Sequence, residues 1–110
     1  MNNPDKLLAE MGKRIAERRK TLRLSQDELA EKADVTPQML STAERGTKAI
    51  RPENLLKISA ALGVSADYLL TGDIIDKDLS LLKEKLKSVS PEQFRSIEKV
   101  IDHCIDLCKQ

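Results

Sequence analysis

Uncharged hydrogen-bonding side chains and one arginine recur in the segment from Thr36 to Arg45. Gln38, Ser41 and Thr42 can each donate and accept hydrogen bonds, while the arginine adds a planar group of donors suited to anions and flat polar acceptors. The apolar residues of the segment are few: Met39, Leu40 and Ala43. A helix with so little to bury indicates a surface that contacts a polar partner.

Two short helices joined by a tight turn are expected to position these side chains. Ser25, followed three residues later by Glu28, forms a capping box, so the first helix should begin at Gln26. Its apolar face carries Leu29, Ala30 and Ala33. Residues 33–35 are predicted to form the turn between the two helices.

The second helix has both a start and a stop signal. Thr36 is its expected N-cap, and Pro37 stands at the first helical position, where a missing N–H costs nothing. Gly46 suits the left-handed position just after the last helical residue. Spacing alone leaves two interpretations open: an ordinary helical hairpin of a small bundle, or a helix-turn-helix whose second helix enters the DNA major groove.

The order of residue types favours the second interpretation. The segments S-Q-x-E-L-A, V-T-P-Q-x-L-S and E-R-G, between Ser25 and Gly46, resemble the helix-turn-helix of the Cro and phage-repressor type regulators, the Xre family. The resemblance covers roughly Met11 to Asp73, about 60 of the 110 residues. It implies an all-α fold, with a five-helix, lambda-repressor-like DNA-binding domain.

The resemblance also implies which side chains contact bases. These lie on the outward face of the helix around residues 36–45: Gln38, Thr42 and Arg45. Glutamine can bond adenine N6 and N7, arginine can bond guanine, and the threonine methyl suits thymine.

Other positions of that helix are expected to contact phosphates or to depart from the family pattern. Thr36 and Ser41 are expected to be phosphate-binding or capping groups. Pro37 stands where several relatives carry a base-contacting polar residue, so that contact is absent or apolar. Ala43 replaces a larger aliphatic residue, so the helix should pack closer or a neighbour should fill the space.

Further phosphate contacts are implied outside that helix. In the family, an arginine near the end of the first helix, here Arg19, forms a salt bridge to the Glu of the E-R-G segment, here Glu44, which can orient the guanidinium toward a phosphate. Gln26 matches a position whose amide and backbone N–H approach a phosphate. Lys48 and Arg51 lie in a loop that runs beside the DNA backbone. A surface ion pair and solvated side chains remain the alternatives.

Composition and charge fit a helical protein and place its cations unevenly. Charged residues make up 34%, hydrophobic residues 40% and aromatic residues 2%, so the core should be aliphatic and base stacking on aromatics is not expected. The net charge of +1 and pI near 7.7 count mildly against a nucleic-acid binder. Residues 1–24, however, hold seven Lys and Arg against three Asp and Glu.

A first helix is predicted from Pro4 or Asp5 to about Leu22. Its apolar residues fall at helical spacing on one face: Leu8, Met11, Ile15 and Leu22. Most of its cations are expected to lie on a solvated face: Lys13, Arg14, Arg18, Lys20 and Arg23.

Two further helices should complete the first domain as scaffold. One is predicted over residues 52–62 with its end at Gly63, and Ser65 should cap a short fifth helix. Tyr68 and Leu69 are expected to cover the first helix.

The residues after Asp73 are predicted to form a second domain, so that the boundaries are 1–73 and 74–110. Ser90, Pro91 and Gln93 form a second capping box between two amphipathic helices. Their stripes recur at spacings of three and four: Leu79, Leu82, Leu86 and Val89, then Phe94, Ile97, Ile101, Cys104 and Cys108.

The stripes on this helical hairpin admit two interpretations. The hairpin could fold back onto the first domain as extra core. Self-association into a homodimer is favoured, because a single helix-turn-helix makes few contacts and two-fold DNA sites need two-fold proteins. Similar tails in the Xre family serve for oligomerisation or for capture by an antagonist protein.

The two cysteines, one helical turn apart beside His103, raise a metal or redox hypothesis. Cys104 and Cys108 could form half of a metal site or a thiol sensor. The favoured interpretation is that both are small hydrophobes on the apolar stripe, with no metal and no cofactor.

Enzyme motifs are missing from the sequence, since it has one His, no Gly-rich phosphate loop and no H-E-x-x-H segment. No apolar run approaches the roughly 18 residues that cross a membrane, and the start does not resemble a secretory signal, so a cytoplasmic location is expected.

These observations lead to one favoured function and two alternatives. The favoured function is a sequence-specific transcriptional repressor that binds an inverted repeat of double-stranded DNA as a homodimer, with half-sites about 34 Å apart. The first alternative is an antitoxin or antagonist-regulated adaptor whose C-terminal helices bind another protein. The second is a thiol or metal sensor.

Overall fold

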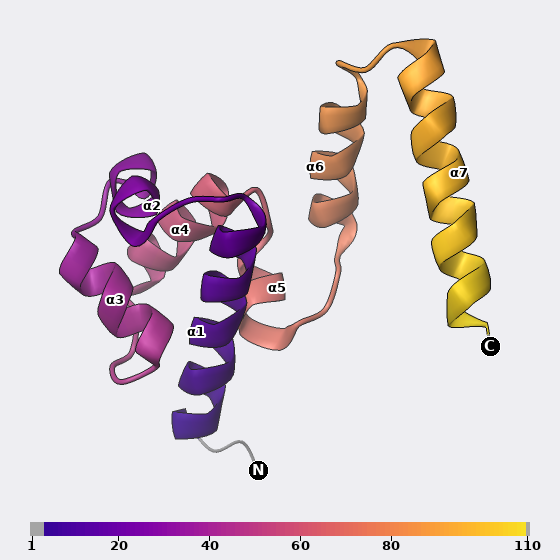
Figure 1. The fold of residues 1–110 in the computed structure, drawn as a ribbon. Helices are drawn as coiled ribbons and strands as arrows, with labels where there is room; N and C mark the ends of the chain where they lie inside the picture. Colours follow the sequence, from indigo (N-terminus) through magenta and orange to yellow (C-terminus); the bar gives the residue numbers. More distant parts are fainter. Residues whose placement is uncertain (1–3, 110) are drawn as a thin grey trace. The chain divides into compact units, whose positions relative to one another are not determined.

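A computed structural model describes residues 4–109, and within this range the chain forms seven α-helices and no strand (Figure 1). The helices are α1 (Pro4–Thr21), α2 (Gln26–Ala33), α3 (Pro37–Arg45), α4 (Pro52–Leu62), α5 (Ala66–Thr71), α6 (Asp76–Leu86) and α7 (Pro91–Cys108). The predicted all-α class, with five helices followed by two more, is confirmed.

The chain divides into two compact units. The first runs to Leu79 and the second begins at Ser80, so the boundary falls inside α6. The sequence pattern predicts a boundary after Asp73 instead. The difference arises because the first turn of α6 is hydrogen-bonded to the start of α5.

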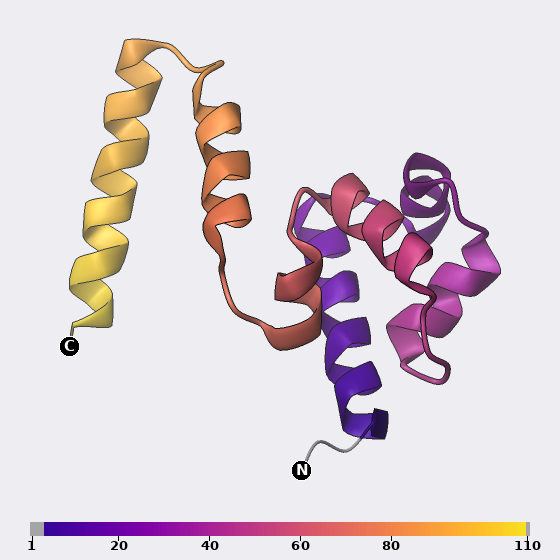
Figure 2. The same cartoon turned by 180° about the vertical axis from the view of Figure 1, so that it is seen from behind.

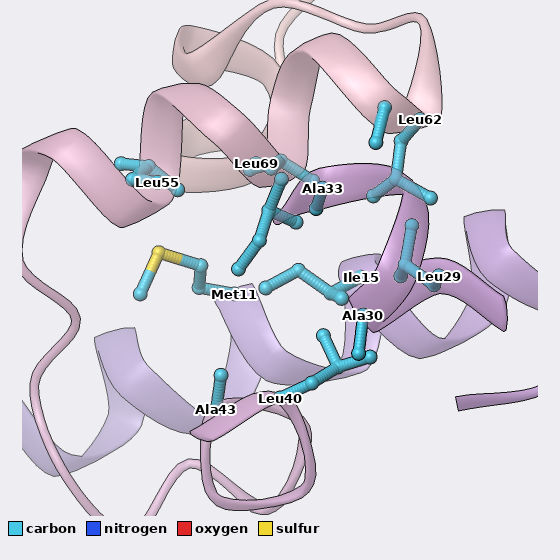
Figure 3. Close-up of a cluster of buried hydrophobic side chains, with 12 residues drawn as sticks. Met11, Ile15, Leu29, Ala30, Ala33, Leu40, Ala43, Leu55, Leu62 and Leu69 are labelled. Carbon is cyan, nitrogen blue, oxygen red and sulfur yellow. The ribbon is translucent and has the colours of Figure 1, made fainter. Parts of the chain in front are cut away.

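In the first unit, α1 to α5 enclose one aliphatic core (Figures 1 and 2). Helix α1 packs against α3, α4 and α5, while α2 packs against α3 and α4. All five helices supply side chains to the cluster in Figure 3: Met11, Ile15, Leu29, Ala30, Ala33, Leu40, Ala43, Leu55, Ile58, Ala61, Leu62 and Leu69. Tyr68 is only partly buried against this core. Burial of apolar surface therefore fixes the positions of α2 and α3.

The ends of α2 and α3 follow from local capping. The Ser25 side chain accepts from the Glu28 N–H at 3.0 Å, and the Glu28 carboxylate accepts from the Ser25 N–H at 2.9 Å. The bond from the Ser25 N–H to the carboxylate is the largest cause of the lowered pKa of Glu28. The Thr36 hydroxyl accepts from the Met39 N–H at 3.0 Å. Gly46 ends α3 at φ 68°, a conformation that favours glycine.

Helix α3 lies unusually close to α1. A Cβ added to Gly12 would stand 2.5 Å from the backbone oxygens of both Ala43 and Glu44. The absence of a side chain at Gly12 therefore lets the two backbones approach. The Ala43 side chain itself is buried in the core.

Two of the arginines predicted to lie on a solvated face of α1 instead cap other helices. Arg14 Nη1 donates to the Leu69 carbonyl at 3.1 Å, near the end of α5, and Arg18 Nε donates to the Leu62 carbonyl at 2.9 Å, at the end of α4. Carbonyls in the last turn of a helix lack intrahelical partners, and the helix dipole favours a cation there. The solvated-face prediction is wrong for this pair, so much of the positive charge of α1 is structural.

The second unit is a helical hairpin in which the start of α7 is capped. Ser90 and Gln93 form a capping box at the start of α7, with bonds of 2.9 and 3.1 Å. Of the described residues in α6 and α7, none is buried. Large apolar side chains are instead exposed along both helices: Leu79, Leu82, Phe94, Val100, Ile101, Ile105 and Leu107. Among residues 4–109, no helix has the length and apolarity needed to cross a membrane.

Candidate nucleic-acid interface

A hydrogen-bonded network joins the end of α1, the start of α2 and the end of α3. Arg19 donates to both Glu44 oxygens, from Nε to Oε2 at 2.8 Å and from Nη2 to Oε1 at 3.1 Å. Gln26 Nε2 donates to the same Oε1 at 3.0 Å, and Arg19 Nη1 donates to the Leu24 carbonyl at 2.8 Å. The structure thus brings together Arg19 and Gln26, both predicted to contact phosphates, with Glu44, the predicted salt-bridge partner of Arg19, and the network links the three helix ends.

This ion pair is largely shielded from water. The Arg19 and Glu44 side chains are 12% and 7% exposed, which distinguishes them from a solvated surface pair. The hydrogen bond to Glu44 raises the pKa of Arg19, an effect that partial desolvation opposes and the charge of Glu44 reinforces. A bidentate pair of this kind holds the guanidinium in one orientation.

The outward face of α3 presents side chains with defined orientations. Gln38 is exposed at the N-terminal end of the helix. The Thr42 hydroxyl donates to the Gln38 carbonyl at 2.9 Å, which leaves its methyl group and its acceptor lone pairs for a ligand. Arg45 Nε reaches the Ser41 carbonyl at 3.4 Å and is exposed. All three residues predicted to contact bases therefore lie on the solvent side of α3 or at its margin.

A hollow of about 340 Å³ lies between α3, the loop that follows it and the start of α4. It is lined by Thr36, Gln38, Met39, Thr42, Ala43, Lys48, Ala49, Ile50, Arg51 and Asn54. Two residues predicted to contact bases, Gln38 and Thr42, thus share one concave surface with the two loop cations, Lys48 and Arg51. The hollow combines apolar groups such as Met39 with hydrogen-bonding groups at one site.

Asn54 is a lining residue that the sequence pattern did not single out. It lies in the first turn of α4, two residues after Pro52. Its polar side chain at a helix start was a usable signal, but only the fold shows that this turn faces α3.

The Arg51 side chain, which lines the same hollow, is 82% exposed and lies 4.0 Å from the Glu53 carboxylate, a surface pair of little energetic weight.

The residues predicted to form the dimer interface lie on α6 and α7, and none of them is buried in one chain. Leu79, Leu82, Phe94 and Ile101 are exposed, while Leu86 and Ile97 are partly buried. Cys104 and Cys108 are free thiols and are exposed. Burial of these thiols on an apolar stripe would therefore require a second helix. Within residues 4–109, no group of three or more His, Cys, Asp and Glu side chains has the arrangement to hold a metal ion.

Comparison with known proteins identifies the fold of the first unit. A family model described as "Helix-turn-helix" matches residues 15–69, which contain the Arg19–Glu44–Gln26 network and the whole of α2 and α3. The chain belongs to the Xre-type helix-turn-helix family. The predicted resemblance is confirmed, and the fold is that of a lambda-repressor-like domain.

Individual Xre-type relatives cover different parts of the chain. It is 44% identical over 64 residues to the Repressor protein C2 of Salmonella phage P22, which aligns with 58% of this chain and 30% of the repressor. The crystal structure of P22 c2 repressor with synthetic operator 9T has a TM-score of 0.55 and 44% identity, and covers 57% of this chain and 96% of that one.

A SinR–SinI protein complex extends the similarity into the hairpin. It has a TM-score of 0.55 and 32% identity, and covers 91% of this chain and 99% of the solved one. The chain is therefore a member of a family of DNA-binding transcriptional regulators, and its relatives include a repressor solved on operator DNA and a regulator solved with a protein partner.

Proposed function

We propose that this Xre-type protein is a transcriptional repressor that binds an inverted-repeat operator as a homodimer, with α3 in the major groove. One observation carries the proposal: the Arg19–Glu44–Gln26 network and the core hold α3 so that Gln38, Thr42 and Arg45 face outward beside a hollow with two cations. The P22 c2 repressor, 44% identical, is solved with a synthetic operator.

Each residue on the outward face of α3 has a distinct role in this proposal. Gln38 contacts an adenine through its amide, since it is exposed at the end of α3 that would enter the groove. Thr42 presents its methyl to a thymine, because its hydroxyl is bonded to the Gln38 carbonyl. Arg45 contacts a guanine or the adjoining backbone.

The phosphate contacts surround this helix. Lys48 and Arg51 bind phosphates from the loop, and Asn54 adds a hydrogen bond from the rim of the same hollow. Ser41 lies on α3 beside them. Thr36 already caps α3 through its hydroxyl, so its phosphate contact is the weakest of the set.

The buried network supplies two further phosphate contacts. Because the Gln26 amide holds Glu44, the phosphate contact of this residue comes from its backbone N–H, at the first position of α2. Arg19 keeps one donor on each of Nη1 and Nη2 after its bonds to Glu44 and Leu24, and these donors bind a phosphate in the proposed complex.

The dimer is proposed to form through the apolar faces of α6 and α7. Both helices are amphipathic, yet in one chain they bury no residue, so a second helical surface is needed to cover them. The interface residues are Leu79, Leu82, Leu86, Phe94, Ile97, Ile101, Cys104 and Cys108. An antagonist protein on the same faces, in place of the second copy, would turn the chain into the adaptor of the alternative hypothesis.

A binding-site selection tests the DNA-binding proposal. The full chain is used to select duplexes from a random pool, and the best site is titrated against a scrambled duplex at two salt concentrations by fluorescence anisotropy. We expect a preference of about 10³-fold or more that survives the higher salt. Equal, salt-sensitive binding to both duplexes would contradict specific recognition.

Two variants then separate base contacts from phosphate contacts. Gln38→Ala should cost about 1–3 kcal/mol for each half-site of the selected site and abolish discrimination at one base pair of each half-site. Lys48→Ala, the control, should weaken binding to all duplexes alike and lower the salt slope by about one for each of the two subunits. If Gln38→Ala behaves like Lys48→Ala, helix α3 is not the element that reads sequence.

A further inference from the structure

A hydrogen-bonded junction ties the first turn of α6 to the start of α5. The Asp78 carboxylate accepts from the Ser65 N–H at 2.8 Å through Oδ1 and from the Ser65 hydroxyl at 2.8 Å through Oδ2. The same Oδ2 accepts from the Ile75 N–H at 3.1 Å. We call these contacts the Ser65–Asp78 junction.

Both the backbone N–H and the hydroxyl of Ser65 form hydrogen bonds in this junction. Its side chain is the N-cap of α5 and accepts from the Tyr68 N–H at 2.9 Å while its hydroxyl donates to Asp78. The residue is only 1% exposed. A bidentate contact between a carboxylate and the N–H and O–H of one buried residue leaves that carboxylate little freedom to move.

The carboxylate also serves the start of α6. Asp78 is the third residue of that helix, and its bond to Ile75 satisfies an N–H just before the helix, as in one half of a capping box. Desolvation, the largest effect, raises the pKa of Asp78, but the bonds from Ile75 and Ser65, with the charge of Lys77, outweigh it and lower the pKa. The ionised form is therefore the one that the junction stabilises.

The junction matters because α6 is the helix in which the boundary between the two compact units falls. Its first turn belongs to the unit that contains α3, and its remainder belongs to the unit with the apolar hairpin. Asp78 acts on the last part of the DNA-binding unit before that boundary. It lies outside the residues matched by the helix-turn-helix family model, 15–69.

We propose that Asp78 is a positioning residue that holds the first turn of α6 on the DNA-binding unit, and thereby limits the half-site spacings that the dimer accepts. This inference rests on the proposed function. Two recognition helices joined through a dimer bind tightly only when their separation matches the operator. A loosened junction lets them reach several spacings, each with less discrimination.

The test uses the full chain and operators whose half-sites are separated by the selected spacer, or by two base pairs more or fewer. Two base pairs move a half-site by roughly 7 Å and rotate it by roughly 70°, so the wild type should lose about 100-fold or more in affinity. Asp78→Asn places an amide against the Ser65 donors. For this variant, the same change of spacer should lower the affinity by less than about tenfold. Asp76→Asn removes the same charge from the same turn but none of these bonds, and it should match the wild type.

Three measurements separate the outcomes. Circular dichroism, sedimentation and binding to a single half-site should be unchanged in Asp78→Asn, because the junction touches neither α3 nor the hairpin faces. Asp78→Ser, which keeps one acceptor but breaks the bidentate contact, replaces Asn if that variant does not fold. The role of Asp78 would be overturned if a folded Asp78 variant lost as much affinity as the wild type when the spacer is changed. It would also be overturned if the affinity of the wild type did not depend on spacer length. A wild type with no preferred duplex or no self-association would instead overturn the proposed function, and the inference with it.

Discussion

The two units carry the same kind of apolar periodicity but differ completely in burial. Ile15, in the stripe of α1, is 0% exposed, whereas Ile101, in the stripe of α7, is 45% exposed. Five helices enclose the first stripe, while α6 and α7 bury none of their described residues. Periodicity thus identifies which face of a helix is to be covered, and the rest of the chain decides whether anything covers it.

The difference has a geometric origin. In the first unit, short connections and small residues such as Gly12 let α1 and α3 approach until their backbones touch. A hairpin of two helices can cover only the sides that face each other, so the wide stripe of α7 stays open. Substitutions in the first unit should therefore change folding, and substitutions on the hairpin stripe should change association.

The largest effect on folding is expected from Gly12→Ala. The added methyl group would stand 2.5 Å from two backbone oxygens of α3, and overpacking against backbone should cost about 3 kcal/mol or more despite the better helix propensity of alanine. Gly63→Ala is the control, because its Cβ would have only the Arg18 side chain at 3.7 Å. Its positive φ alone should cost about 1 kcal/mol. Urea unfolding gives both values, and equal costs would contradict the close packing of α1 and α3.

The shielded ion pair gives the next largest effect. Glu44→Ala leaves the Arg19 guanidinium without its partner in a site where both side chains are mostly covered, and should cost about 2–3 kcal/mol of unfolding free energy. Glu53→Ala removes a pair that is mostly exposed, with Arg51, and should change stability by less than about 0.5 kcal/mol. Similar costs in thermal or urea unfolding would show that the network does not hold α3.

Self-association responds to the hairpin stripe. Ile101→Glu should raise the dissociation constant of the dimer by about tenfold or more, measured by sedimentation, because it places a charge at the centre of the proposed interface. Lys99→Glu lies on the opposite face of α7 and should leave it unchanged. A lower melting temperature of Ile101→Glu with no change in association would show that the stripe packs on the first unit instead.

The smallest effect concerns pH and the Ser65–Asp78 junction. A carboxyl group with a lowered pKa in the folded state stabilises the protein above its unfolded pKa, and this contribution is lost as the pH falls through the folded value. As the pH falls below about 4, the usual value for an unfolded Asp, the wild type should therefore lose more stability than Asp78→Asn. Parallel pH profiles for the two proteins would contradict the charged junction.

Local signals made much of the fold predictable from sequence. The capping boxes at Ser25 and Ser90 and the stop at Gly46 depend on residues within a few positions, and the helices begin and end where these signals place them. The contacts of Arg14 and Arg18 could not be predicted in the same way. Their partners are 55 and 44 residues away, and such contacts exist only once α1 has packed against α4 and α5.

In the candidate site, too, some features could be predicted from the sequence and others depend on the folded structure. Family resemblance located Arg19, Glu44 and Gln26, but only the structure shows the Gln26 amide bonded to Glu44. Asn54 joins the site because the start of α4 closes the hollow. Contacts with DNA by Gln38 and the other predicted residues remain predictions, since they depend on the surface of a second molecule.

The stoichiometry and affinity of the operator complex test the central claim most directly. The full chain is titrated onto the selected inverted-repeat duplex and onto the same duplex with one half-site scrambled. Two chains should bind the intact duplex, and scrambling one half-site should weaken binding by about 100-fold or more. One chain per duplex, with equal affinity for both, would contradict a dimer that reads DNA through two α3 helices.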